Sequence, residues 1–200
     1  MNNVQTKIGE IVKDTLDLFY NTDDFNNLLS HNIKIFTVFV SLPMRDRTPN
    51  DIFNDILKMT ASNEFLEHIK FFERADDGEI VAIKFVANNI WNDCKHSEIM
   101  LGIHPDHKDR IFYREDMKST TLDGLKKNKR CSTDYLGEAI KSLGRCEYVL
   151  FHPDYSNANG CLVEEFVADK YNKIPFYIQN LDDTNRLITD RIVSELGISL

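Results

Sequence analysis

The sequence predicts a single α/β domain with a mostly parallel sheet and helices on both of its faces. Short apolar runs at 32–40, 148–151 and 174–178 are rich in β-branched and aromatic residues, which is typical of strands buried on both faces. Segments with apolar residues at helical spacing alternate with these runs. This alternation implies right-handed βαβ crossovers, and a chain of 200 residues, 42% of them hydrophobic, is long enough to bury one substantial core.

Composition and charge exclude several classes of protein. Thirteen Phe and seven Tyr supply more apolar surface than a disordered chain carries. No run reaches the roughly 18 apolar residues of a membrane span, and the first residues lack the basic and apolar segments of a signal peptide. We therefore expect a cytoplasmic protein without a membrane partner. The net charge of -8 repels polyanions and argues against polymeric nucleic acid. The four cysteines contain no C-x-x-C pair, and we expect reduced thiols.

The first third of the chain contains an extension and the start of the domain. Residues 7–20 carry apolar side chains at helical spacing and predict an amphipathic helix within an N-terminal extension, 1–31. The domain itself spans 32–200. Thr48 and Pro49 are typical of a helix N-cap and first helical position. The helix that they open has one apolar face, formed by Ile52, Phe53, Ile56 and Leu57.

The middle of the chain gives weaker patterns. Residues 71–86 hold two apolar runs around the turn sequence Asp76-Asp77-Gly78, which fits a hairpin or a strand that follows a loop. Residues 88–130 are polar, and we expect an insertion of irregular structure there. The histidines of this insertion fit no standard zinc pattern, and we interpret its basic cluster, 126–130, as solvated charge.

The last third alternates between helices and strands. We expect helices at 135–144, 160–171 and 183–196, and strands at 148–151 and 174–178. In the second of these helices, the apolar side chains expected to face the core are Leu162, Val163, Phe166 and Val167.

Two polar loops are expected at the same edge of the sheet. Residues 41–47 follow the first strand and residues 152–160 follow a later one, and in an open parallel sheet the ligand crevice lies outside the carboxyl ends of the strands. The second loop leads into a helix whose first turn is expected to hold Glu164 and Glu165. The helix dipole would favour the ionised form of a carboxylate there, and an ionised carboxylate can attack an anomeric carbon. The same two residues would equally fit a purely structural role as partners of the dipole.

Two motifs resemble those of one known family. In this sequence an expected strand and a Pro-Asp-Tyr-Ser-Asn turn are followed by Gly160, by Glu164 four residues later and by Ala168 four residues after that. These intervals are those of the first motif. The loop Ser41-Leu42-Pro43-Met44-Arg45 is similar to a Ser-Gly-Pro-Met motif, with Leu42 in place of the glycine. Both resemble motifs of the nucleoside 2-deoxyribosyltransferase-like superfamily, and in particular of its uncharacterised phage and bacterial branch.

The resemblance covers residues 33–60 and 132–180 and implies a flavodoxin-like, Rossmann-like fold. It implies cleavage or transfer at the N-glycosidic bond of a nucleoside or nucleoside 5′-monophosphate, with Glu164 as the nucleophile, no metal or organic cofactor, and a homo-oligomer. Arg45 would pair with a phosphate, as would backbone N–H groups at the helix start. The expected substrate contacts are Ser41, Pro43, Met44, Arg45, Tyr135, Asp154, Tyr155, Asn157, Asn159 and Gly160.

Two positions depart from the family pattern. Ala139 stands where family members usually carry an Asp that handles the base, and Ala158 stands where they carry Ser or Asp. Glu138 and Asp134 are the nearest acids to the first position and are the further expected catalytic residues. The alternatives for contact with the base are Asp154 and Asn157. If none of these has taken over that contact, the protein binds or sequesters a nucleotide without cleaving it.

Overall fold

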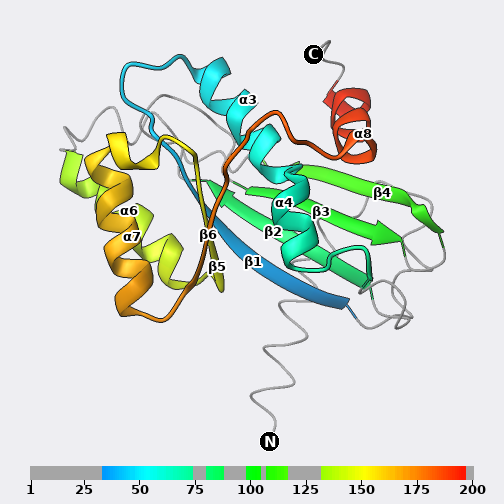
Figure 1. Cartoon of the computed structure of the whole chain (residues 1–200), viewed down its shortest axis with the longest axis horizontal. Helices are drawn as coiled ribbons and strands as arrows, with labels where there is room; N and C mark the ends of the chain where they lie inside the picture. The colour runs from blue at the N-terminus through cyan, green and yellow to red at the C-terminus, as the bar shows by residue number, and fades with distance from the viewer. Residues whose placement is uncertain (1–32, 74–79, 88–97, 105–106, 117–131, 197–200) are drawn as a thin grey trace, which may run out of the picture.

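The computed structural model of the chain describes residues 33–73, 80–87, 98–104, 107–116 and 132–196 (Figure 1). The predicted N-terminal helix, the loop sequence Asp76-Asp77-Gly78 and the basic cluster 126–130 lie outside these residues. None of the described helices is both long and apolar enough to cross a membrane.

The described strands form one sheet in the order β4-β3-β2-β1-β5-β6. The strands β2, β1, β5 and β6 run parallel to one another, and β3 and β4 extend the sheet antiparallel beyond β2. Their bounds are β1 Ile33–Ser41, β2 Ile80–Ala87, β3 Glu98–His104, β4 His107–Asp116, β5 Tyr148–Phe151 and β6 Ile174–Tyr177. The predicted α/β class with a mostly parallel sheet is confirmed.

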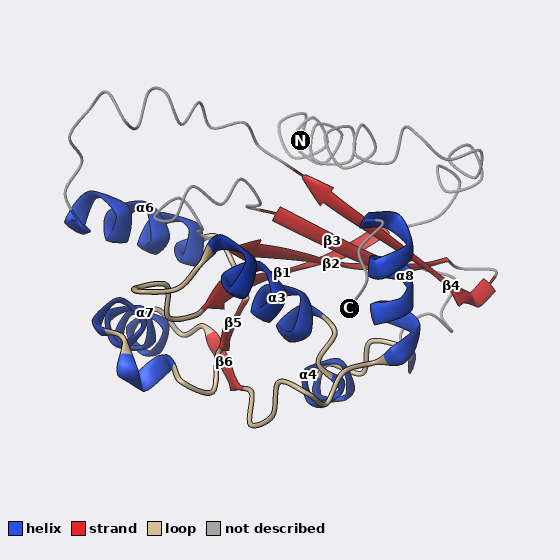
Figure 2. Cartoon of the chain, turned by 90° about the horizontal axis from the view of Figure 1, so that it is seen from above, coloured by secondary structure: helices blue, strands red, loops and turns tan. Residues whose placement is uncertain are grey.

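Helices cover both faces of this sheet, as the sequence predicts. One face packs against α3 (Pro49–Thr60), α4 (Asn63–His68) and α8 (Arg186–Leu196), and the other packs against α6 (Ser132–Gly144) and α7 (Asn159–Lys170). Figure 2 shows α6 and α7 together at one side of the molecule, apart from the other three helices. The strands contribute alternate residues to the two cores, so Val38 and Val40 lie in one core and Phe39 lies in the other.

The start of α3 follows its predicted cap. The Thr48 hydroxyl accepts a hydrogen bond from the backbone N–H of Asp51, and the Asp51 carboxylate accepts one from the backbone N–H of Thr48. This capping box satisfies two backbone donors that a helix start leaves unpaired. Pro49 occupies the first turn, and Ile52 and Ile56 are fully buried against the sheet.

The prediction of irregular structure over 88–130 is wrong for the part that the structure describes. β3 and β4 lie in this range and pair with each other as antiparallel strands, with β3 also paired to β2. The β4 sequence, HKDRIFYRED, is highly charged, and β4 lies at the edge of the sheet. Edge strands tolerate charge because it discourages pairing with other chains, and that charge hides the strand pattern in the sequence. For residues 71–86, the alternative of a strand after a loop is confirmed, because β2 begins at Ile80.

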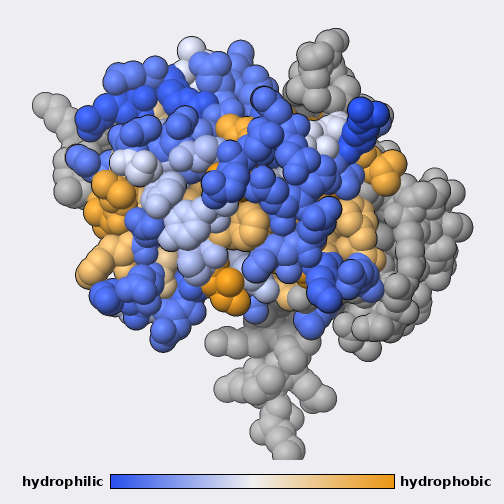
Figure 3. All heavy atoms as spheres, viewed as in Figure 1, coloured by the Kyte–Doolittle hydropathy of each residue, from blue (hydrophilic) through white to orange (hydrophobic). Residues whose placement is uncertain are grey.

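The orientation predicted for α7 is wrong for three of its four apolar residues, and only Val167 of the four packs against the core. Leu162, Val163 and Phe166 are 41%, 40% and 62% exposed instead of facing the core. Figure 3 shows hydrophobic side chains among hydrophilic ones on the side of the molecule where α7 lies. The buried residues of α7 are Cys161, Glu164 and Ala168. Apolar residues occur around this whole helix, so periodicity does not define its inward face, and the small Cys161 and Ala168 allow α7 to approach the sheet closely.

The last helix begins later than predicted. Asn185 accepts hydrogen bonds from the backbone N–H groups of Leu187 and Ile188 through its side-chain oxygen, which is the pattern of an N-cap, so α8 begins at Arg186 rather than at 183. The two residues before this cap pair with the start of α4 instead: the backbone N–H of Asn63 donates to the carbonyl of Asp183 at 3.1 Å. The short helix α4 itself was not predicted.

Candidate functional site

The strand order reverses between β1 and β5. The strand that follows β1 in the sequence, β2, lies on one side of it, and β5 lies on the other. Open α/β sheets bind their ligands beside such a reversal, at the carboxyl ends of the strands. Ser41 ends β1 opposite Phe151, which ends β5, and the backbone N–H of His152 donates to the Ser41 carbonyl at 2.9 Å. The two loops singled out in the sequence therefore begin side by side.

Glu164 is a buried carboxyl at this reversal. Its side chain projects from α7 and is 8% exposed, and the Ser41 hydroxyl donates to its Oε2 at 2.6 Å. Among the described residues, no hydrogen bond reaches its other oxygen, Oε1. Burial raises the pKa of Glu164 to about 7, although the hydrogen bond from Ser41 lowers it in part. A buried polar atom without a partner is unusual in a folded protein and is frequently functional.

The expectation that the helix dipole holds Glu164 in its ionised form is wrong. α7 begins at Asn159 and has no acidic residue in its first turn, so Glu164 lies in the second turn. The dipole effect falls off within the first turn, and the backbone N–H groups of the second turn are already paired. Desolvation therefore outweighs the dipole, and protonated and ionised forms of Glu164 are both populated near pH 7.

Cys161 completes the buried cluster around Ser41. It is 3% exposed and has no disulfide partner. Burial, together with the nearby charge of Glu164, raises the pKa of its thiol to about 12, and a hydrogen bond with Ser41 offsets only part of this shift. Cys161 is thus a thiol rather than a thiolate at neutral pH, and it is a poor nucleophile. Cys146 is likewise buried, and its Sγ donates to the carbonyl of Ser142 at 3.4 Å; within the described residues neither cysteine forms a disulfide, as the sequence predicts for reduced cysteines.

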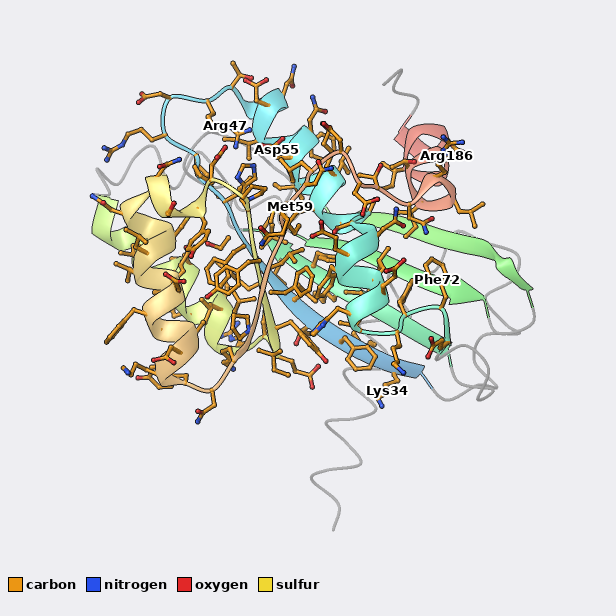
Figure 4. All side chains as sticks on the ribbon, in the orientation of Figure 1. Lys34, Arg47, Asp55, Met59, Phe72 and Arg186 are labelled. Atoms are coloured by element: carbon orange, nitrogen blue, oxygen red, sulfur yellow. The ribbon has the colours of Figure 1, made fainter. Side chains whose placement is uncertain are left out.

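An ionic cluster beside the two loops was not anticipated from the sequence. Asp55 of α3 accepts hydrogen bonds at Oδ2 from the guanidinium of Arg47 and from Nε2 of His152. Figure 4 shows Arg47 and Asp55 close together near the start of α3. Burial alone would raise the pKa of Asp55, but the hydrogen bonds from His152 and Arg47 outweigh it and lower that pKa. The only signal available in the sequence is the interval of eight residues between Arg47 and Asp55, which predicts a contact only once the helix is placed.

Glu165 belongs to a different cluster from Glu164. Its Oε1 accepts hydrogen bonds from the hydroxyls of Tyr155, at 3.0 Å, and Tyr177, at 2.9 Å. The Tyr177 ring stacks on Phe151 with an interplanar angle of 15°. Burial and the hydrogen bond to Glu165 raise the pKa of Tyr177 to about 12. Tyr155, expected as a substrate contact, is thus tied to α7 and β6 through Glu165.

The remaining expected residues divide between the first loop and the segment before α7. In the first loop, Pro43 accepts a hydrogen bond from Arg47 at its carbonyl, Met44 packs against the core, and Arg45 is exposed. In the second segment, Asp154, Asn157 and Asn159 are exposed. A Cβ added at Gly160 would meet nothing within 4 Å, so the space beside this residue is open.

Glu138 and Asp134 are the acids expected from α6. The structure describes no contact between either of them and Glu164. Glu138 pairs with Lys141 at 2.8 Å on α6, and its side chain is 43% exposed. Asp134 and Tyr135 belong to α6, but their side chains lie outside the described part. Ala139 is buried in the core between α6 and the sheet.

The fold and the site together define a class: an α/β domain with a buried carboxyl at its strand-order reversal, one oxygen of which has no hydrogen-bond partner among the described residues. No family model matches the chain, and the searches of curated proteins and of solved structures also return no match. Within the described residues, no group of three or more His, Cys, Asp or Glu side chains lies together in a way that could hold a metal ion.

Proposed function

We propose that this protein catalyses cleavage or transfer at the N-glycosidic bond of a nucleoside or nucleoside 5′-monophosphate, with Glu164 as nucleophile. The fold that we propose for it is flavodoxin-like, and the order β2-β1-β5-β6 of its parallel strands supports this. A homo-oligomer remains part of the proposal, since the family resemblance implies one, and light scattering that finds a monomer would contradict that part.

One observation carries the proposal: Glu164 is a buried carboxyl with Oε2 held by Ser41 and Oε1 without a described partner, at the edge where such sheets bind ligands. Two neighbouring ionisable side chains differ from Glu164. Both ring nitrogens of His152 are engaged, with Asp55 and with the backbone N–H of Asp154. Glu165 is less buried than Glu164, and its Oε1 accepts from two tyrosines.

The chemistry proceeds in two displacements. Oε1 of ionised Glu164 attacks the anomeric carbon, the bond from that carbon to the base nitrogen breaks, and its electron pair leaves with the base. The base takes a proton from an acid or from water. A second base or a water molecule then displaces the carboxylate from the sugar, which restores Glu164. Ser41 stabilises the charge on Oε2 whenever the carboxylate is free.

Contact with the base is assigned to one of four residues. Asp154 and Asn157 are exposed on the loop that leads into α7, and Glu138 and Asp134 belong to α6. A carboxylate paired with a lysine, as Glu138 is with Lys141, can accept a hydrogen bond from a base but has no proton to donate. Arg45 is exposed at the first loop, as a contact for a 5′-phosphate requires.

The test is release of free base from a panel of deoxynucleosides, ribonucleosides and their 5′-monophosphates, followed by chromatography. We expect release by the wild-type protein and a loss of at least a hundredfold in Glu164→Gln. Glu147→Gln is the matched control, because Glu147 is exposed at the end of the sheet opposite the loops. Equal release by wild type and Glu164→Gln would exclude Glu164 from the mechanism.

A second candidate function is nucleotide binding without turnover. It is favoured by Ala139, which is 5% exposed within an apolar core and offers no polar group, and by Ala158, which caps α7 without a side-chain hydrogen bond. These are the two positions where the family carries polar residues. A nucleotide that binds tightly and is recovered intact after long incubation would support this candidate, whereas released base would exclude it.

A further inference from the structure

Asp55 connects the two loops that begin beside Glu164. It lies on α3, and its side chain is 16% exposed. Its Oδ2 accepts from Arg47, which belongs to the loop after β1, and from His152, which begins the loop after β5, with the second bond measuring 3.0 Å. His152 and Asp55 are 97 residues apart in the sequence. One carboxylate of α3 thus contacts a side chain from each of the two loops.

Arg47 extends this connection through the first loop. Its Nη1 donates to the carbonyl of Pro43 at 3.1 Å, and its Nη2 donates to the carbonyl of Asp51 at 3.3 Å in addition to Asp55. The guanidinium has a fixed fork of donors, so these bonds constrain its plane as well as its position. The loop from Pro43 to Arg47 is therefore closed on itself and fastened to α3.

His152 extends the connection through the second loop. Its Nδ1 accepts from the backbone N–H of Asp154 at 3.0 Å, so in the neutral ring the proton is on Nε2, which donates to Asp55. The His152 backbone N–H donates to the carbonyl of Ser41 at 2.9 Å. Ser41 is the residue whose hydroxyl contacts Glu164, so the ring of His152 is linked to the contact with Glu164 through the residues His152 and Ser41 themselves.

We propose that Asp55 is a positioning residue of this site: through Arg47 and His152 it holds the two loops together and keeps bulk water away from the Glu164 carboxyl. The inference rests on the proposed function only in taking Glu164 as the working group. Asp55 does not touch the substrate in this account. Without it, the loops separate at Ser41 and water reaches the carboxyl.

The test is an NMR titration of the full chain with ¹³C at the Glu side-chain carboxyls. The Glu164 signal is the one that Glu164→Gln lacks. Wild type is expected to titrate at a pKa of about 7, because burial raises it. In Asp55→Ala we expect this pKa to fall by roughly one unit or more, towards the ordinary value of Glu, because water then solvates the ionised form.

A second substitution separates positioning from charge. Asp55→Asn removes the same negative charge but keeps an acceptor for Nε2 of His152, so we expect a smaller fall than in Asp55→Ala. Loss of charge alone would shift both variants equally. Asp182→Asn is the matched control, because it removes the acid from another ion pair of α3, with Lys58 at 2.8 Å, and it should leave the titration unchanged.

Equal shifts in the Ala and Asn variants, or no shift in either, would overturn the proposal. If Asp55→Ala does not fold, His152→Phe breaks the same connection while keeping the ring volume, and it should lower the Glu164 pKa as much. The titration needs no substrate. Failure of the proposed function would appear separately, as the absence of released base with the wild-type protein.

Discussion

The Ser41 hydroxyl donates a hydrogen bond of 2.6 Å to Oε2 of Glu164, and this bond joins the end of β1 to the second turn of α7. Ser41 and Glu164 are 123 residues apart in the sequence. They meet because the chain places β1 and β5 side by side and α7 directly after β5. The bond fixes one carboxylate oxygen, and among the described residues no hydrogen bond reaches the other.

Ser41→Ala should move the pH dependence of base release to higher pH. The Ser41 hydroxyl favours the ionised form of Glu164 and lowers its pKa, so removing the hydroxyl should raise that pKa further above about 7. The nucleophile is the ionised form, and so the rising limb of kcat/KM against pH should shift upwards. Ser156→Ala, at an exposed position in the second loop, is the control. A rising limb at the same pH in both variants would show that this hydrogen bond does not set the ionisation of Glu164.

Glu164→Gln should change how stability depends on pH. The raised pKa means that the folded wild type binds more protons than the unfolded chain between the ordinary Glu pKa of 4.5 and about 7. The free energy of unfolding of the wild type therefore falls as pH rises through this window and stays low above it. Gln does not titrate, so the free energy of unfolding of Glu164→Gln should lack this fall.

Urea unfolding at pH 5 and pH 8 measures this difference. Between the two pH values, the stability of Glu164→Gln relative to wild type should improve by roughly 2–3 kcal/mol. Glu147→Gln should show no such change, because Glu147 is exposed. If the difference in the free energy of unfolding between Glu164→Gln and wild type were the same at both pH values, the Glu164 carboxyl would not be desolvated in the folded protein.

Gly160→Ala should weaken nucleotide binding without harming the fold. A Cβ at this position meets nothing within 4 Å, and Gly160 lies in the first turn of α7, where Ala is the better helix former. If a phosphate lies against the backbone N–H groups there, the added methyl group occupies its space, and we expect Kd to rise about tenfold. Gly137→Ala in α6 is the control, since its Cβ is equally unobstructed. An unchanged Kd in Gly160→Ala would mean that the ligand does not approach this helix start.

Local patterns account for what the sequence could predict. The run of β-branched residues at 32–40 specifies β1. The start of α3 is specified by Thr48, Pro49 and Asp51, which lie within four consecutive residues. The motifs that contain Ser41 and Glu164 follow two strand ends, and the carboxyl ends of parallel strands share one edge of a sheet, so the sequence predicts that these motifs lie close together.

What the sequence could not predict depends on tertiary geometry. The inward face of α7 is ambiguous because apolar residues surround the helix, and the choice that buries Glu164 exposes Phe166 at 62%. The pKa of Glu164 depends on which face of α7 is inward and on the start of this helix at Asn159. The interval between Gly160 and Glu164 in the sequence shows neither. The contact of Asp55 with His152 spans 97 residues and exists only once α3 and β5 are both placed.

The central claim is that the Glu164 carboxylate forms a bond to the sugar. Wild-type protein is mixed with a substrate that releases base, the reaction is quenched in acid within milliseconds to seconds, and the digested protein is examined by mass spectrometry. The account predicts a peptide that carries the sugar on Glu164, and no such peptide from Glu164→Gln. Base release with the sugar on another residue, or by wild type with Glu164 unmodified at every quench time, would contradict it.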